Sequence, residues 1–433
     1  MAETTKTDQQ AKPTPSVAAR FRPKLTVAPL RVRNFRLLVI GQGISEFGSA
    51  FQVVALPLLI FARGGSAAQI GLVVSAFGLG RLITTPIAGI FVDRYGAWRI
   101  MMVSDLGRML LAAALASVAA TGWGGSVVIG ALAGPVGLFS GLFLPAEASV
   151  MPSVLPPEQL HAGNSLNNTV TYAAGLFGPN VAGLVVAFIN PATAFAVDSA
   201  TFAASALSLL AIGRTRPSAA PKKQKPDNAA EPDPVPVPKG FFALLRASPI
   251  LRNILVVTVV ANLTMGGLAR VALPVLATKE LRVGAEGLGA LIGAFAAGSL
   301  VGGLFAGGLA GIRRRGRAAM ISGLVLGTAV TLTPLAGLAG ALIMLFIAGA
   351  AATVANVLVV TTVQKGTPPE LLGRTMSAIF FCGISLFPVS VVLVGLLVDA
   401  YGSRSFFFIT GASLLAAFSF GLSRKAIRTA TDD

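Results

Sequence analysis

The amino-acid sequence predicts an all-α membrane protein built from two related six-helix bundles. Three observations support this prediction: an apolar composition, twelve long apolar segments, and a repeat that relates the two halves of the chain. Of the 433 residues, 54% are hydrophobic and only 12% are charged, whereas soluble domains average about 25% charged residues. The chain is therefore too apolar for a soluble protein and is expected to be embedded in a membrane.

The apolar segments are long enough to cross a bilayer, because about 20 apolar residues in a helix span its hydrocarbon core. The sequence predicts such helices at 35–62, 69–92, 100–121, 126–149, 164–188, 191–213, 250–277, 286–310, 318–338, 340–363, 375–398 and 405–423. No cleavable signal peptide is expected before the first of them. The proline-rich, charged region 214–249 is predicted to be a solvated linker between bundles at 35–213 and 250–424. Basic and polar tails are expected at 1–34 and 425–433.

Basic residues predict the orientation of the chain. With both ends inside the cell, 27 of the 34 Lys and Arg residues fall in inner segments, 4 fall in outer loops and 3 lie within helices. Such an excess of basic residues marks the cytoplasmic side of membrane proteins. It also explains the net charge of +17 without nucleic acid, since a basic tail can contact anionic lipid. We therefore expect a multi-pass protein of the inner (plasma) membrane with both termini in the cytoplasm.

The two halves repeat one another. Ala55-Leu56-Pro57 recurs as Ala272-Leu273-Pro274, and three further matches follow in the same order at offsets of 212 to 218 residues: Ala76-Phe77-x-x-Gly80 with Ala294-Phe295-x-x-Gly298, Gly89 with Gly307, and Pro156-Pro157-Glu158 with Pro368-Pro369-Glu370. Two halves derived from one six-helix unit predict a cavity at their interface near the middle of the membrane, with the halves rocking around it.

Enzymatic and ATP-driven functions lack the residues that they need. The single cysteine, Cys382, and the single histidine, His161, exclude disulfides and His-rich or Cys-rich metal centres. No phosphate-binding Gly-x-x-x-x-Gly-Lys-Ser/Thr loop is present. We therefore expect no enzyme activity and no cofactor, and energy that comes from an ion gradient or from the gradient of the substrate.

A conspicuous loop joins the second and third apolar segments: Gly89-Ile-Phe-Val-Asp93-Arg94-Tyr-Gly96-Ala-Trp-Arg99. It resembles the signature loop between helices 2 and 3 of major facilitator superfamily transporters. This resemblance implies the major facilitator fold and a loop that latches the two halves together while the transporter is open outward. The alternative is an ordinary basic loop that only sets topology. The corresponding place in the second half has no acid, so the latch is expected to be asymmetric.

The fifth apolar segment contains Gly178-Pro179 and Gly183, with alanines at 174 and 182. This stretch resembles, in part, the Gly-Pro motif of drug:proton antiporters, which implies export rather than uptake. The alternative is a structural kink, because proline removes a backbone hydrogen bond and small residues let helices approach closely. Further short matches resemble the branch that holds macrolide-efflux and enterobactin-exporter-like proteins: Val32-Arg33-Asn34-Phe35-Arg36, Pro145-Ala146, Asn164 and Phe195-x-x-Asp198-x-x-x-Phe202.

Charged residues within membrane segments mark candidate functional sites, since each is costly there. Glu46 lies deep in the first segment, and Gln42 and Ser49 share its helix stripe. Burial disfavours the charged form of a lone acid, so Glu46 is the candidate for proton coupling. Binding of a cationic substrate and structural pairing are the alternatives. In the family the first helix lines the cavity, which places Gln42 and Ser49 among the candidate substrate-cavity residues.

Other polar residues have an expected role, and some have an alternative, such as a cavity role for Glu147. Asp105 and Arg108 are expected to form a structural pair on one helix face, Glu147 to join the inner loop through Arg94 or Arg99, and Asp198 to stabilise a helix start near the outer face. Arg270 is expected either to reach towards the outer surface or to contact an anionic substrate. Asn262, Thr353 and Asn356 are candidate cavity residues, with helix–helix hydrogen bonds as the alternative. Arg81 has no partner that the sequence identifies.

Together these features predict a secondary transporter that exports a hydrophobic or amphiphilic small molecule, such as an antibiotic, a drug or a siderophore-like compound, by proton antiport. The alternatives are a proton-coupled uptake symporter of the same fold and a non-transporting membrane receptor. The expected partners are the small-molecule substrate and the lipid bilayer, and the chain is expected to act as a monomer. The residues do not identify the substrate.

Overall fold

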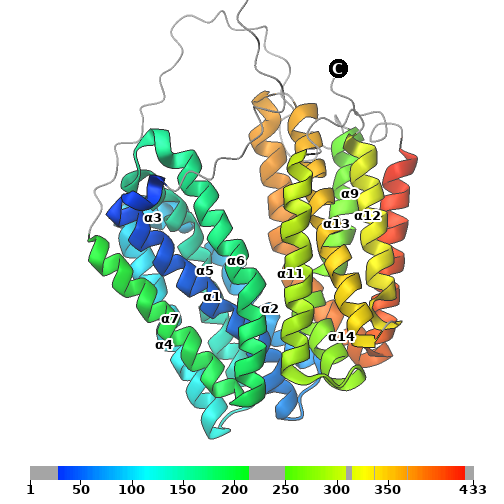
Figure 1. Ribbon diagram of the computed structural model, residues 1–433, viewed down its shortest axis with the longest axis horizontal. Helices are drawn as coiled ribbons and strands as arrows, with labels where there is room; N and C mark the ends of the chain where they lie inside the picture. The colour runs from blue at the N-terminus through cyan, green and yellow to red at the C-terminus, as the bar shows by residue number, and fades with distance from the viewer. Residues whose placement is uncertain (1–27, 214–248, 309–314, 336, 368, 425–433) are drawn as a thin grey trace, which may run out of the picture.

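The computed structural model describes residues 28–213, 249–308, 315–335, 337–367 and 369–424 (Figure 1). These residues form helices joined by short connections, and no strand occurs among them. Nearly all of the predicted linker and most of the two predicted tails lie outside the described residues. The predicted domain boundaries therefore stay predictions.

The first half of the chain, called the N-half, contains α1 (Arg33–Ala62), α2 (Ala67–Thr84), α3 (Ala88–Tyr95), α4 (Ala97–Thr121), α5 (Ser126–Val154), α6 (Leu160–Phe188) and α7 (Pro191–Ile212). Polar side chains cap two of the helix starts, where the first N–H groups have no partner within the helix. Ser66 and Gln69 form a reciprocal capping box at the start of α2. Asn190 accepts a hydrogen bond from the backbone of Thr193 at the start of α7.

The second half, called the C-half, contains α9 (Pro249–Met265), the π-helical turn η4 (Leu268–Ala272), α10 (Leu273–Val275), the π-helical turn η5 (Leu276–Glu280), α11 (Gly284–Gly308), α12 (Arg315–Leu332), the 3-10 turn η7 (Thr333–Leu335), α13 (Gly337–Gly366) and α14 (Pro369–Ser423). The range of α14 covers two successive helices. Gly402, with φ 81° and ψ 163°, separates them.

The twelve predicted segments all correspond to helices, with ends that differ by a few residues. Eleven described helices are long and apolar enough to cross a membrane, and the last of these contains the break at Gly402 that separates the two final predicted segments. Two features were not predicted. The second segment is divided into α2 and α3 at the turn around Pro86, where proline cannot donate a helical hydrogen bond. The seventh contains π-helical turns on both sides of α10.

The two halves pack against each other at one end of the molecule and separate towards the other (Figure 1). We call the end that carries α3 the inner end, following the predicted orientation, and the opposite end the outer end. Close contacts between the halves are made by α2 with α14 and by α6 with α11. A Cβ at Gly71 would lie 2.5 Å from the Val391 carbonyl oxygen, and one at Gly183 would lie 2.6 Å from that of Ala285. Both sites are in the outer part, so small residues let the halves meet there.

The inner end is open. One buried apolar cluster runs through both halves and includes Phe51, Val73, Val271 and Val391, whereas a second cluster is confined to the inner part of the N-half. The apolar core therefore joins the halves only towards the outer end, and the conformation is open inward.

The predicted orientation can be tested with a fusion reporter that is active only outside the cytoplasm. Placed after Gly213, at the inner end of α7, the reporter is expected to stay silent, because most basic residues of the sequence fall on this side. The same reporter placed after Gly124, between α4 and α5, is expected to be active. Activity after Gly213 would contradict both the orientation and the twelve-helix arrangement.

Candidate functional site

The N-half contains a buried charge network centred on Arg108 of α4. The predicted pair is present: the Arg108 guanidinium donates to Asp105 Oδ1 at 2.5 Å, and both side chains are almost fully buried. Ser205 of α7 donates to the other oxygen of Asp105 at 2.7 Å. The guanidinium also lies between the rings of Phe143 and Phe202, 4.1 and 4.5 Å from their centroids. These contacts hold α4, α5 and α7 together around one cation.

Glu147 does not meet the inner loop in this state, contrary to the prediction. Its carboxylate accepts a hydrogen bond from Asn167 Nδ2 of α6 at 2.9 Å. The charged groups that act on it are Glu46, Arg108 and Asp105. Helix α5 is continuous to Val154, and this places Glu147 two turns above the helix end, facing the charge network instead of Arg94 or Arg99.

Asp198 does not stabilise a helix start, contrary to the prediction. It is the eighth residue of α7, beyond the first turn, and it is completely buried. Neither of its carboxylate oxygens has a hydrogen-bond partner among the described residues. Arg108 and Glu46 are the charged groups that act on it. A buried carboxylate without hydrogen bonds is costly, so Asp198 belongs with the charge network and not with the outer surface.

Glu46 of α1 is exposed in the inward-open conformation, although it lies in the middle of a 30-residue helix. It acts electrostatically on both Glu147 and Asp198. The rest of its predicted stripe is less open: Gln42 is 5% exposed and has no hydrogen-bond partner among the described residues, and Ser49 donates to the Ser45 carbonyl of its own helix at 3.0 Å. Of this stripe, Glu46 is therefore the residue that is open to water.

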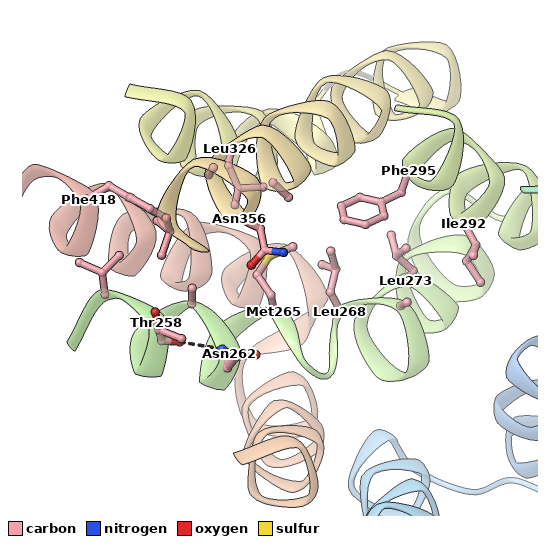
Figure 2. A pocket seen from close by; sticks show the side chains of 16 residues that line it. Thr258, Asn262, Met265, Leu268, Leu273, Ile292, Phe295, Leu326, Asn356 and Phe418 are labelled. Carbon is pink, nitrogen blue, oxygen red and sulfur yellow. Dashed lines mark hydrogen bonds between the residues drawn. The ribbon is translucent and has the colours of Figure 1, made fainter. Parts of the chain in front are cut away.

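A cavity of 310 Å³ lies within the C-half (Figure 2). The sequence predicted a cavity between the halves, but every residue that lines this one belongs to the C-half. Three of its sixteen lining residues are polar and none is charged. They are Val257, Thr258, Ala261, Asn262, Met265, Leu268, Ala269, Leu273, Ile292, Phe295, Leu326, Ala352, Ala355, Asn356, Val359 and Phe418. An apolar cavity with a few convergent polar groups suits a hydrophobic or amphiphilic small molecule.

Asn262 and Asn356 lie on facing sides of this cavity, with the Met265 side chain between them (Figure 2). Asn262 Nδ2 donates to the Thr258 carbonyl of its own helix at 2.9 Å, which leaves its side-chain oxygen available. Asn356 is exposed. Thr353, the third predicted cavity residue of this half, does not line the cavity and instead lies near Gly303 of α11. Two of the three predicted cavity residues of this half, Asn262 and Asn356, therefore line the cavity.

Arg270 lies between the halves, on the π-helical turn η4. Its guanidinium is 5.5 Å from the ring of Phe77 in the N-half and 5.7 Å from the ring of Phe387 in the C-half. It has no carboxylate partner among the described residues, and the other charged group that acts on it is Arg81. A space of about 10 Å³, enough for about one water molecule, adjoins it. Arg270 thus does not reach the outer surface.

The Gly178-Pro179 motif of α6 lies where the halves cross. Gly178 packs against Ala50 of α1, and the Pro179 carbonyl lies against Gly289 of α11, where a side chain could not fit. Gly183 meets Ala285 of α11. Small residues on both helices therefore let the two halves pack closely on the outer side of this crossing.

The inner loop is disengaged in this conformation. Asp93, Arg94 and Arg99 are exposed, and no atom of a neighbouring element lies within 4 Å of a Cβ built at Gly89. Gly96 ends α3 with φ 86°, a conformation that favours glycine. Arg94 contacts only the ring of the adjacent Tyr95 among the described residues.

The sequence analysis did not predict a contact between the halves at the outer end in which an aspartate takes part. Asp399 of α14 accepts hydrogen bonds from the backbone N–H groups of Ala67 and Ala68 of α2, both at 2.8 Å. Nearby, Glu280 accepts hydrogen bonds from the Ser403 hydroxyl and the Arg404 backbone, and its other oxygen pairs with the Arg404 guanidinium at 2.6 Å. The sequence around Asp399 resembles the inner loop around Asp93. It was overlooked because the two segments are not separated by the offset of 212 to 218 residues that relates the two halves.

Solved transporter structures share this arrangement of helices. A bacterial homolog of the human lysosomal transporter Spinster, in an inward-facing and unoccupied conformation, matches 93% of this chain and 98% of its own with a TM-score of 0.71 and 16% identity. A bacterial homologue of the iron transporter ferroportin, in an inward-facing state, matches 90% of this chain and 99% of its own with a TM-score of 0.67 and 16% identity. At these identities the likeness concerns the fold alone.

Two sequence relatives are similar over most of the chain, and a third over less than half of it. An MFS-type transporter, y4rN, from Sinorhizobium fredii is 27% identical over 390 residues, which are 88% of this chain and 93% of the relative. The multidrug efflux pump Tap of Mycolicibacterium fortuitum is 27% identical over 401 residues, 88% of this chain and 91% of the pump. Tap of Mycobacterium tuberculosis is 31% identical over 184 residues, 41% of this chain and 43% of the pump.

The family assignment follows from a match that is independent of any single relative. Residues 38–387 match the family model of the Major Facilitator Superfamily, and this range includes the inner loop, the Gly178-Pro179 motif and most of both halves. The protein is therefore a multi-pass membrane protein and a member of the Major Facilitator Superfamily, a family of transporters and not of enzymes.

Proposed function

We propose that this transporter exports a hydrophobic or amphiphilic small molecule in exchange for protons. The observation that carries the proposal is the separation of two kinds of site. Glu46, Asp105, Glu147 and Asp198 lie close enough to Arg108 and to one another in the N-half to interact electrostatically. The C-half cavity, in contrast, is lined by no charged residue. Protons and substrate would thus be handled by different halves. The similarity to the multidrug efflux pump Tap supports the direction and the substrate class.

In this proposal Glu46 takes up and releases the proton, because it is exposed to the inner opening while it faces the buried carboxylates. The substrate occupies the C-half cavity, where Asn262 and Asn356 provide hydrogen bonds and Met265 adapts to different shapes. Arg270 adjoins the separate small space between the halves, where it would favour substrates that carry an anionic group. Gln42, Ser49 and Thr353 remain proposed cavity residues for other states of the cycle.

The remaining assignments are proposals of the same kind. The loop with Asp93 would hold the inner ends of the halves together in the outward-open state. Both termini and the 214–249 linker would face the cytoplasm, and the chain would work as a monomer in the inner (plasma) membrane. Antibiotics, dyes and siderophore-like compounds are the substrates to screen, by comparing the susceptibility of cells with and without the protein.

Antiport can be tested without a labelled substrate. In inverted membrane vesicles that hold an inside-acid pH gradient, an exported compound is expected to collapse part of the gradient, and a pH-sensitive dye reports this. Ethidium and uncharged and anionic amphiphiles are suitable probes. A compound that increases the gradient would indicate symport and hence uptake. Ligand binding to the purified protein without any change in the gradient, for every probe, would favour a receptor and contradict the proposal.

The C-half cavity predicts the effect of Asn356→Leu, which keeps the branched shape and the number of side-chain heavy atoms but removes the amide. For a probe that can form hydrogen bonds, KM is expected to rise about tenfold, since one such bond in an apolar site contributes about 1.4 kcal/mol. For a purely hydrocarbon-like probe, KM is expected to stay within about twofold. Thr361→Val, at a half-buried position of the same helix that does not line the cavity, is the matched control. An equal effect for both kinds of probe would place the substrate elsewhere.

A further inference from the structure

The outer ends of the two halves are joined by an acid that caps a helix of the other half. Asp399 lies at the end of the first helical part of α14, in the C-half, and its two carboxylate oxygens accept hydrogen bonds from Ala67 N–H and Ala68 N–H of α2, in the N-half. The first N–H groups of a helix have no partner within it, and they carry positive partial charge. A carboxylate at this place therefore makes charge-assisted hydrogen bonds.

The cap is divided between the halves. Gln69 N–H, the next donor of the same turn, is satisfied by Ser66 Oγ from the N-half itself. Ala67 and Ala68 depend on Asp399 and would be left to water if the outer ends separated. The start of α2 is thus completely capped only while the halves touch, so the two hydrogen bonds stabilise the inward-open state relative to any state that is open outward.

The surrounding contacts support the same state. A Cβ at Gly395 would lie 2.6 Å from the Ala67 carbonyl oxygen, so only glycine lets α14 approach α2 this closely. The ammonium group of Lys279, in the C-half, lies 5.3 Å from the ring centroid of Phe61, in the N-half. Asp399, itself exposed, therefore lies at the edge of a closely packed contact between the halves at the outer end.

The sequence around Asp399 repeats the inner loop. Gly395-Leu-Leu-Val398-Asp399-Ala-Tyr401-Gly402 matches Gly89-Ile-Phe-Val92-Asp93-Arg-Tyr95-Gly96 at the glycine, valine, aspartate, tyrosine and final glycine. The backbone agrees as well, because both segments end a helix at a glycine with positive φ, 86° at Gly96 and 81° at Gly402. One segment lies at the inner end of the N-half and the other at the outer end of the C-half.

The two copies are in opposite states in this conformation. Asp399 makes both of its hydrogen bonds to the other half, and Gly395 touches α2. Asp93, by contrast, makes no hydrogen bond to the other half among the described residues, and a Cβ built at Gly89 would meet no atom within 4 Å, although both aspartates are exposed to solvent. The outer copy is engaged where the halves are closed, and the inner copy is free where they are open.

We propose that Asp399 is an outer latch that holds the transporter in its inward-open state, and that the Gly-x-x-Val-Asp-x-Tyr-Gly segments at 89–96 and 395–402 engage alternately during transport. Releasing the outer latch leaves two backbone N–H groups of α2 to water, while closure of the inner end engages the inner copy. The proposal does not depend on the identity of the substrate or of the coupling ion, since it concerns only the balance between the two open states.

Distances between spin labels at the two ends test the proposal in the full-length protein. Cys382 is first replaced by serine, so that only introduced thiols are labelled. Val127→Cys and Leu335→Cys report the separation of the halves at the outer end, and Glu158→Cys and Arg317→Cys report it at the inner end. All four positions are exposed. In the parent protein, the short outer distance and the long inner distance are expected to dominate.

Asp399→Asn is expected to shift the ratio of inward-open to outward-open molecules about two- to fivefold towards the outward-open state, with a longer outer and a shorter inner distance, because an exposed carboxylate at a helix N-terminus contributes about 0.3–1 kcal/mol. Asp93→Asn is expected to shift the ratio in the opposite direction or to leave it inward. Glu280→Gln is the matched control: it removes an acid at the same surface, but the partners of Glu280, Ser403 and Arg404, are in its own half. It is expected to leave the ratio unchanged.

A second variant separates the latch from folding. Gly395→Ala keeps the carboxylate and places a methyl group against the Ala67 carbonyl, so it is expected to shift the ratio in the same direction as Asp399→Asn. Size-exclusion profile and thermal stability identify folded protein. Unchanged distances in folded Asp399→Asn, or an equal shift in Glu280→Gln, would overturn the proposal, as would an unchanged ratio in Gly395→Ala if Asp399→Asn does not fold.

Discussion

Glu46→Gln is expected to abolish transport that is driven by a pH gradient and to leave exchange of substrate down its own gradient within about threefold of the parent. The carboxamide keeps the size and the hydrogen-bonding capacity of the side chain but cannot release a proton. Glu46 is exposed at the inner opening and acts on two neighbouring acids, Glu147 and Asp198. A change in the charge of Glu46 would therefore alter the electrostatic energy of Glu147 and Asp198.

The measurement compares two fluxes in the same proteoliposomes: accumulation on an imposed pH gradient and downhill exchange without one. Glu46→Asp is expected to retain part of the accumulation, because a carboxylate remains. Glu286→Gln is the matched control, since Glu286 is an exposed acid in the first turn of α11, far along the chain from the network. Accumulation by Glu46→Gln at the level of the parent would place coupling elsewhere, with Glu147, Asp105 and Asp198 as the next candidates.

Arg108→Gln is expected to cause a large loss of stability. Arg108 is the cation that the surrounding acids share, and its removal would leave Asp105 buried with only the hydrogen bond from Ser205. Loss of one partner of a buried pair typically costs about 3–5 kcal/mol. The packing of the guanidinium between Phe143 and Phe202 would be lost as well. Thermal unfolding in detergent should show a clearly lower transition temperature.

Two further variants identify the cause of that loss. In the double variant Asp105→Asn/Arg108→Gln the uncompensated charge is gone, so part of the lost stability is expected to return. Arg404→Gln removes an arginine from a pair of similar length, 2.6 Å to Glu280, but the Arg404 side chain is 63% exposed. Surface pairs contribute about 0–1 kcal/mol, so this control is expected to change the transition temperature little. Equal losses for Arg108→Gln and Arg404→Gln would mean that burial does not determine the effect.

The helices could be predicted because each depends on a local property of the chain. About 20 consecutive apolar residues can satisfy their backbone groups in a bilayer only as a helix, and this condition is visible in any sequence window. The Asp105–Arg108 pair was predicted for the same reason, since a spacing of three places both side chains on one helix face. The break at Pro86 was not predicted because proline also occurs inside continuous helices here, as at Pro57 and Pro179. The π-helical turns around Arg270 were not predicted because apolar windows contain no signal for them.

The placement of the other acids depended on contacts between distant segments. Glu147 was expected at the inner loop because it lies near the end of a predicted helix, but the helix is longer and turns its carboxylate to Asn167, twenty residues further on. Asp198 was expected near a surface because it follows a helix start, but α1 and α4 cover that face of α7 and bury it completely. In both cases the position of the acid along its own helix could be read from the sequence. The sequence did not identify the helix that packs against that acid.

The sequence by itself determined the membrane-embedded helices, the division into two related halves, the family resemblance and the charged residues that the bilayer makes costly. These properties follow from composition, length and short spacings. The tertiary structure alone decided which half contains the apolar cavity, which acids gather around Arg108, and which end of the molecule is closed. The closed end is held by contacts such as Asp399 with Ala67, more than 300 residues apart. Such contacts exist only once the two halves are packed, and their free energy differs between the inward-open and outward-open states that one sequence encodes.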